Sequence, residues 1–130
     1  MTTIMISIRP EWCEKIMKLE KRWEVRKTMP TSRGIPCRCL IYQSGGGGVI
    51  GEFMCDSIEE IRYEDLTVER LKDTFLPLEE AREYASGLTL YKWSIRSLVI
   101  YPEPRPVSLY GLDRPPQSWC YVKGGDPDGP

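Results

Sequence analysis

The chain of 130 residues contains no histidine. This absence excludes the Ser-His and Cys-His pairs that activate nucleophiles, and it removes the commonest protein ligand of zinc. The five cysteines include no C-x-x-C pair, so a metal site is disfavoured as well. We expect the cysteines, including Cys37 and Cys39 on one predicted strand, to be small buried apolar residues. The sequence therefore predicts neither a metal nor a cofactor.

The sequence also lacks a long apolar run. No stretch approaches the roughly 20 apolar residues that a helix needs to cross a bilayer. The first residues, MTTIMISIRP, have neither the basic region nor the apolar core of a secretory signal. An odd number of cysteines without an export signal is typical of a reducing compartment. We therefore expect a cytoplasmic protein that does not enter a membrane, while the oligomeric state is not readable from the sequence.

Length and composition fit one folded unit. A hydrophobic fraction of 41% and four tryptophans are sufficient for a core in a chain of this size. We predict a single domain over residues 1–123 and a flexible tail, GGDPDGP, over 124–130.

The net charge of −1 is unevenly distributed along the chain. Residues 1–44 carry nine basic and four acidic residues (+5), 45–90 carry four and eleven (−7), 91–123 carry five and two (+3), and the last seven residues add two Asp (−2). Two basic segments that flank an acidic one fit either a basic face for a polyanion or an ordinary mixed-charge surface.

The stretch from residue 7 to residue 27, SIRPEWCEKIMKLEKRWEVRK, organises the rest of the sequence. It begins with a strand end and continues as a short helix, in which Pro10 suits the first position because that N–H needs no partner. Trp12, Ile16 and Leu19 recur at helical spacing and predict one apolar face.

A second strand follows this helix. Trp23 and Val25 alternate with Glu24 and Arg26, which is the period of a strand. We predict that residues 21–27 form a strand with the two apolar side chains buried and the two charged side chains on a cleft face.

Further strands are expected over residues 4–8, 37–42, 49–58, 88–101 and 117–122. The glycine run 45–48 lacks the Lys-Ser/Thr of a phosphate-binding loop and predicts a hairpin connection. The acidic segment 64–86 predicts a helical insertion, and the prolines from Pro102 to Pro106 are expected to end strand pairing. The pattern amounts to five or six strands with helices inserted at two places.

Two separated motifs resemble one family. SIRP at residues 7–10, then a helix, then K-x-x-E-x-R at 21–26 resemble the motif of the ASCH family, a branch of the PUA-like β-barrels. RPPQSWCYV at 114–122 is similar to the last strand of small phage or bacterial ASCH proteins. The resemblance covers nearly the whole chain and implies an α+β fold, a small mixed β-barrel with a short motif helix and a helical insertion. Leu19 stands where the family usually has glycine, so the geometry of the turn after the helix need not follow the family pattern.

The resemblance implies a cleft beside the motif that binds single-stranded RNA, a nucleoside or a nucleotide. Lys21 offers a point charge to phosphate, and Arg26 offers a planar fork. Glu24 is able to accept from an exocyclic amine, and Trp119 is able to stack on an unpaired base. On the residues alone, the charged trio also fits a surface ion-pair cluster. The expected ligand-binding residues are Ser7, Arg9, Lys21, Glu24, Arg26, Gln117, Ser118 and Trp119.

Two alternatives stay open. One branch of ASCH-like proteins hydrolyses acylated cytidine with a lysine and a threonine of this motif. Lys21 keeps the lysine, but Glu24 occupies the threonine position, so these two residues would be the catalytic pair of an amidohydrolase. Binding is favoured, because a carboxylate beside Lys21 favours the charged ammonium, which is a poor nucleophile. The other alternative is a protein-interaction module of a phage or mobile-element regulator, with the acidic segment as its binding face.

Overall fold

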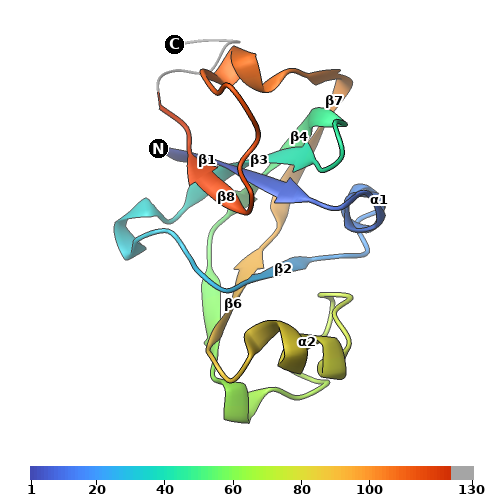
Figure 1. The fold of residues 1–130 in the computed structure, drawn as a ribbon, viewed down its shortest axis with the longest axis vertical. Helices are drawn as coiled ribbons and strands as arrows, with labels where there is room; N and C mark the ends of the chain where they lie inside the picture. Colours follow the sequence, from blue (N-terminus) through green and yellow to red (C-terminus); the bar gives the residue numbers. More distant parts are fainter. Residues whose placement is uncertain (124–130) are drawn as a thin grey trace.

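The computed structural model describes residues 1–123, so the predicted tail lies outside the described residues. Strands, two α-helices and three short 3-10 helices alternate along the chain (Figure 1). The elements are β1 Thr2–Ile8, α1 Pro10–Met17, β2 Trp23–Arg26, η1 Ser32–Gly34, β3 Cys37–Gln43, β4 Gly48–Cys55, β5 Ile58–Ile61, η2 Tyr63–Asp65, α2 Leu78–Ala85, β6 Leu90–Ser94, β7 Arg96–Arg105, η3 Val107–Tyr110 and β8 Trp119–Tyr121. Within the described part of the chain, no helix is long and apolar enough to span a membrane.

The strands form two sheets. The larger sheet has the order β7-β4-β3-β1-β8, and the smaller has the order β2-β6-β5. β1 runs parallel to β3, and α1 and β2 lie in the connection between them. Ile95 alone separates β6 from β7, so one nearly continuous strand passes from the smaller sheet into the larger one. In Figure 1 this strand descends from β7 to β6, and α2 lies below β6.

The α+β class is confirmed, but a closed barrel is not. Within the described residues, β7 and β8 are the edges of the larger sheet, and β2 and β5 are the edges of the smaller one. Alternation of apolar and polar residues identifies a strand without identifying its partner, so closure could not be read from the sequence.

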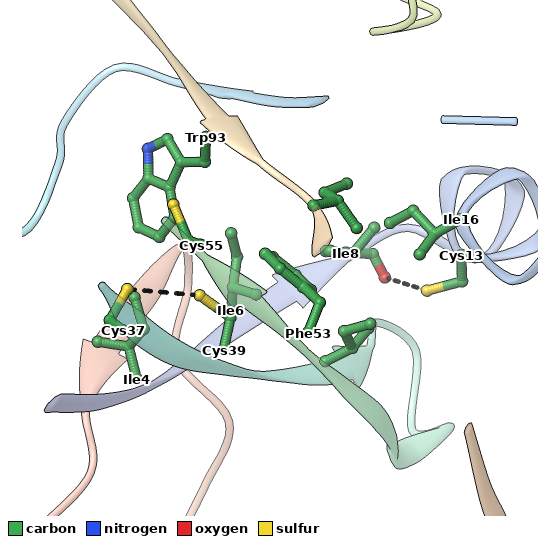
Figure 2. Packing of buried hydrophobic residues seen from close by; sticks show 12 residues of the cluster. Ile4, Ile6, Ile8, Cys13, Ile16, Cys37, Cys39, Phe53, Cys55 and Trp93 are labelled. Carbon is green, nitrogen blue, oxygen red and sulfur yellow. Dashed lines mark hydrogen bonds between the residues drawn. The ribbon is translucent and has the colours of Figure 1, made fainter. Parts of the chain in front are cut away.

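Three apolar clusters hold these layers together. The first lies between the two sheets and joins Trp93 of β6, strands of the larger sheet, and Cys13 and Ile16 of α1. In Figure 2, Trp93 lies near Cys55, and Cys13 and Ile16 lie at the other end of the cluster. The second packs α2 against the outer face of the smaller sheet, and the third lies on the opposite face of the larger sheet. Four cysteines are buried as expected, and the fifth, Cys120, is half-buried. Burial raises the pKa of the Cys13 thiol to about 12, so this thiol stays protonated at neutral pH.

Helix α1 begins at Pro10 as predicted, and Cys13 and Ile16 form its buried side. Leu19 was expected on that side, which is wrong: its side chain is 62% exposed. The backbone of Leu19 has a φ of 61° and ends the helix in the left-handed region. The next two amide N–H groups then both donate to the Lys15 carbonyl, at 3.0 and 3.1 Å. A leucine thus occupies a conformation that glycine adopts more easily.

The acidic segment is less helical than predicted. Only η2 and α2 are helical there, and residues 66–77 form turns between them. Asp73 and Phe75 both have positive φ values, near 63° and 62°, which are incompatible with a continuous helix.

The proline-rich segment also differs from the expectation. β7 continues through Pro102 and Pro104 to Arg105, which pairs with Val49 of β4. Because β7 is an edge strand, the missing proline N–H groups can face away from the ladder.

Candidate functional site

A buried charge network lies at the beginning of the smaller sheet. Lys21 and Glu24 are 4% and 5% exposed. The Lys21 Nζ lies 3.1 Å from Glu24 Oε1, and it also donates to the carbonyl of Thr74. Arg26 binds the other Glu24 oxygen through Nε at 2.8 Å and Nη2 at 2.6 Å. Each carboxylate oxygen therefore has a cationic partner.

Local sequence explains how these groups meet. In β2, Glu24 is paired opposite Trp93 of β6, so its side chain projects to the inner face of the smaller sheet, while Val25 projects to the α2 side. The predicted alternation of the side chains between two faces is thus confirmed, although Glu24 is buried on its face. Trp23 is half-buried rather than buried, and the Nζ of Lys92 lies 4.6 Å from its ring centroid. Lys21 belongs to the turn before β2, not to the strand.

The charges of the network fix the ionisation of Glu24. Burial alone would raise the pKa of this carboxyl, but the charges of Lys21 and Arg26 and their hydrogen bonds hold it below its ordinary value of 4.5. The carboxylate is therefore ionised at neutral pH and able to hold the arginine in one orientation.

Arg26 joins three segments that are distant in the sequence. Its Nη2 donates to the carbonyl of Ser7 at the end of β1, at 2.7 Å. Its Nη1 donates to the Ser118 Oγ at 3.2 Å. Ser7 in turn donates its N–H to the Ser118 carbonyl at 2.9 Å and its Oγ–H to the Pro116 carbonyl at 2.6 Å. The guanidinium thus fixes the chain before β8 against β1 and β2.

Aromatic side chains continue the site along β8. The Nε1–H of Trp119 donates to the Thr28 Oγ1 at 2.9 Å. The Trp119 ring stands edge-on to Trp93 on one side and to Tyr121 on the other, with centroids 5.5 and 5.3 Å apart. Tyr121 is 47% exposed, and its hydroxyl accepts from the N–H of Thr31.

The segment beside these rings adds basic side chains. Lys27 ends the motif stretch, and Arg33 lies in η1; both side chains are exposed. We call Arg26, Lys27, Arg33, Ser118, Trp119 and Tyr121 the aromatic-basic surface.

The structure brings most of the predicted residues together. Ser7, Glu24, Arg26 and Ser118 are in direct contact, Lys21 joins through Glu24, and Trp119 follows Ser118. Arg9 and Gln117 are both exposed. Arg9 lies immediately before α1 as its N-cap residue, where its carbonyl accepts from Trp12 and Cys13.

Sequence reasoning missed Thr28, Thr74, Tyr84 and Tyr121. Tyr121 lies two residues after Trp119 in the last strand, so strand alternation could have identified it. Tyr84 of α2 lies beneath the Lys27 ammonium, 4.6 Å from ring centroid to Nζ, and burial raises the pKa of its hydroxyl. No local pattern links Thr74 or Tyr84 to a strand more than 45 residues earlier.

Two hollows lie near the network. An open groove of about 750 Å³ runs along the turns of the acidic segment, lined by apolar side chains such as Phe75 and Leu76 and by Glu69 and Asp73. A smaller cavity of about 130 Å³ lies at the start of β2 and includes Lys21 in its lining. Since ligand pockets usually measure about 300–1,000 Å³, the smaller cavity is too small for a whole nucleoside.

Comparison with known proteins identifies the fold. The crystal structure of ASCH from Zymomonas mobilis matches this chain with a TM-score of 0.79 and 21% identity, covering 93% of this chain and 87% of its own. A variant of that protein with a serine replaced by alanine matches with a TM-score of 0.80 and 21% identity, covering 93% of this chain and 88% of its own. A variant with a tyrosine replaced by phenylalanine matches with a TM-score of 0.79 and 21% identity, covering 93% of this chain and 90% of its own. No family model matches the sequence, and no curated protein matches it. The protein is therefore of the ASCH-type α+β fold, and its resemblance to the Zymomonas protein is one of fold.

Proposed function

We propose that this chain is an RNA-binding domain that receives a single strand on the aromatic-basic surface. One observation carries the proposal: Arg26 is held by the buried Glu24 and reaches Ser118 directly beside the Trp119–Tyr121 pair. A fixed guanidinium next to stacked aromatic rings is the combination with which proteins bind unpaired nucleotides.

We infer different roles for the members of the network from how deeply each is buried. Lys21 and Glu24 are almost inaccessible, so they position Arg26 and do not themselves contact a ligand. Arg26 retains some exposure and lies beside the exposed Ser118, where both can meet a phosphate. Tyr121 presents its ring to a base, and Lys27 and Arg33 attract the backbone from solution.

The test is fluorescence anisotropy of a labelled single-stranded RNA oligomer at low and at moderate salt. We expect weak, salt-sensitive binding. Tyr121→Leu removes the exposed ring and should cost about 1–3 kcal/mol if one base stacks there. Arg33→Gln should reduce the slope of log K against log salt by about 0.7, the value for one phosphate contact with a single strand.

The matched control is Arg62→Gln, which removes an equal charge from an exposed position after β5. It should leave binding nearly unchanged. The proposal is wrong if no binding occurs at low salt, or if the control weakens binding as much as Arg33→Gln does. Comparing the affinity for a DNA oligomer of the same sequence shows whether the protein recognises the 2′-hydroxyl.

Hydrolysis of acylated cytidine ranks below binding. Lys21 Nζ is engaged by Glu24 and by the Thr74 carbonyl. The structure does bring a threonine hydroxyl into this region, since Thr74 is buried beside Lys21, but that hydroxyl donates to the Leu71 carbonyl at 2.6 Å and accepts from the Leu76 N–H. We expect no release of acetate from N4-acetylcytidine, followed by chromatography. Rapid turnover that Lys21→Ala abolishes would reverse this ranking.

A further inference from the structure

The smaller cavity at the start of β2 is lined by cations without a carboxylate. Lys21, Arg22 and Arg96 contribute to its lining with Ser97, and the other lining residues are apolar. We call it the cationic cavity. It lies where β6 passes into β7.

Two of its three cations have unused hydrogen-bond donors. Lys21 is neutralised by Glu24, as described above. Arg22 and Arg96 are exposed, and among the described residues neither guanidinium has a carboxylate or hydrogen-bond partner. The Arg96 guanidinium lies over the face of Trp23, 5.9 Å from the ring centroid. Two guanidinium groups at one cavity repel each other, and an anion between them would relieve that repulsion.

The backbone around the cavity is held in place. The N–H of Arg22 donates to the Asp73 carbonyl at 2.9 Å, and the Arg22 carbonyl accepts from the N–H of Ile95 at 2.9 Å. Ser97 follows with a φ of 51°, a left-handed conformation that costs energy for a residue with a Cβ. The two arginines are thus anchored on a fixed backbone, which lowers the entropic cost of converging on a ligand.

We propose that the cationic cavity is a phosphate-binding subsite, in which Arg22 and Arg96 clamp one phosphate group. Its volume of about 130 Å³ admits a tetrahedral oxyanion and excludes a whole nucleoside. That the phosphate belongs to RNA rests on the proposed function. The existence of the anion site does not depend on it.

The test uses inorganic phosphate and no RNA. Titration at constant ionic strength, with chloride as the reference anion, is followed by the NMR signals of the arginine Nε–H groups. We expect saturable shifts at Arg22 and Arg96, and at least tenfold weaker affinity in the double variant Arg22→Gln/Arg96→Gln. Arg62→Gln/Arg82→Gln is the control, because it removes the same charge from two exposed positions, one directly after β5 and one in α2.

The outcomes separate this inference from the proposed function. The phosphate site is overturned if the shifts do not saturate or if chloride reproduces them. It is also overturned if the control variant loses as much phosphate affinity as Arg22→Gln/Arg96→Gln does. Tyr121→Leu should leave the phosphate titration unchanged even though it weakens RNA binding. RNA oligomers with and without a 5′-phosphate then identify the source: tighter binding of the phosphorylated oligomer indicates a terminal phosphate, and equal binding that still requires Arg22 and Arg96 indicates the backbone.

Discussion

At the scale of single residues, Leu19 shows a local conflict between sequence and conformation. The residue ends α1 with a positive φ, and its side chain is largely exposed, so little burial offsets the strain. Helical spacing placed it on the buried face, because periodicity does not reveal where a helix ends. Its position in the ASCH motif that the sequence resembles, where glycine is usual, was the better indicator of the left-handed turn.

Leu19→Gly should therefore stabilise the protein. Glycine adopts the left-handed conformation without the Cβ clash, and this gain exceeds the extra entropy of the unfolded chain. We expect an increase of about 0.5–1 kcal/mol in the free energy of unfolding, measured by urea denaturation. Leu88→Gly, at another exposed leucine without a positive φ, is the control and should be neutral or destabilising. Equal effects of the two changes would contradict this account.

At the scale of elements, β2 depends on partners from across the chain. Alternation predicted which side chains of β2 share a face, and that part of the site was readable from the sequence. The partners were not, because Thr74 and Ser118 lie 53 and 92 residues from the side chains that they contact. Such pairings follow from the arrangement of the sheets, which no local pattern encodes.

Removing the carboxylate of β2 should be strongly destabilising. Glu24→Gln leaves Lys21 and Arg26 buried without a counter-charge, and breaking such a pair costs about 3–5 kcal/mol. Glu14→Gln is the matched control, since the Glu14–Lys18 pair is exposed and such pairs contribute at most about 1 kcal/mol. Urea denaturation of both variants gives the comparison. Similar losses in the two would show that the network contributes little to stability.

At the scale of the whole molecule, stability should depend on acid pH. Burial raises the pKa of Glu24, but Lys21 and Arg26 outweigh this effect and hold the pKa low. The pKa of Glu52 is lowered chiefly by its hydrogen bonds with Arg38. A carboxyl with a lowered folded pKa stabilises the protein above its ordinary value of 4.5, and that contribution is lost as the pH falls through the folded pKa.

The midpoint of thermal unfolding should thus change little from neutral pH down to about pH 5 and fall steeply below the ordinary carboxyl pKa. Glu24→Gln, where it folds, should show a flatter dependence over the acid range, because one of the two groups no longer titrates. If the unfolding midpoint of Glu24→Gln falls as steeply with acid pH as that of the unmodified protein, the pH dependence arises from other carboxyls.

Ile95, the one residue between β6 and β7, also determines how the two sheets can move. Its N–H is bonded to Arg22, and the strands on either side of it belong to different ladders. At this junction the sheets therefore cannot separate by bending at a loose loop; the Ile95–Arg22 hydrogen bond and the core between the sheets would have to be disrupted. The molecule should behave as a single rigid body on the microsecond timescale, with slow hydrogen exchange at the Ile95 amide. A single strand bound as we propose would then have to adapt its own shape to the protein, and the entropic cost of ordering on binding would fall on the nucleic acid.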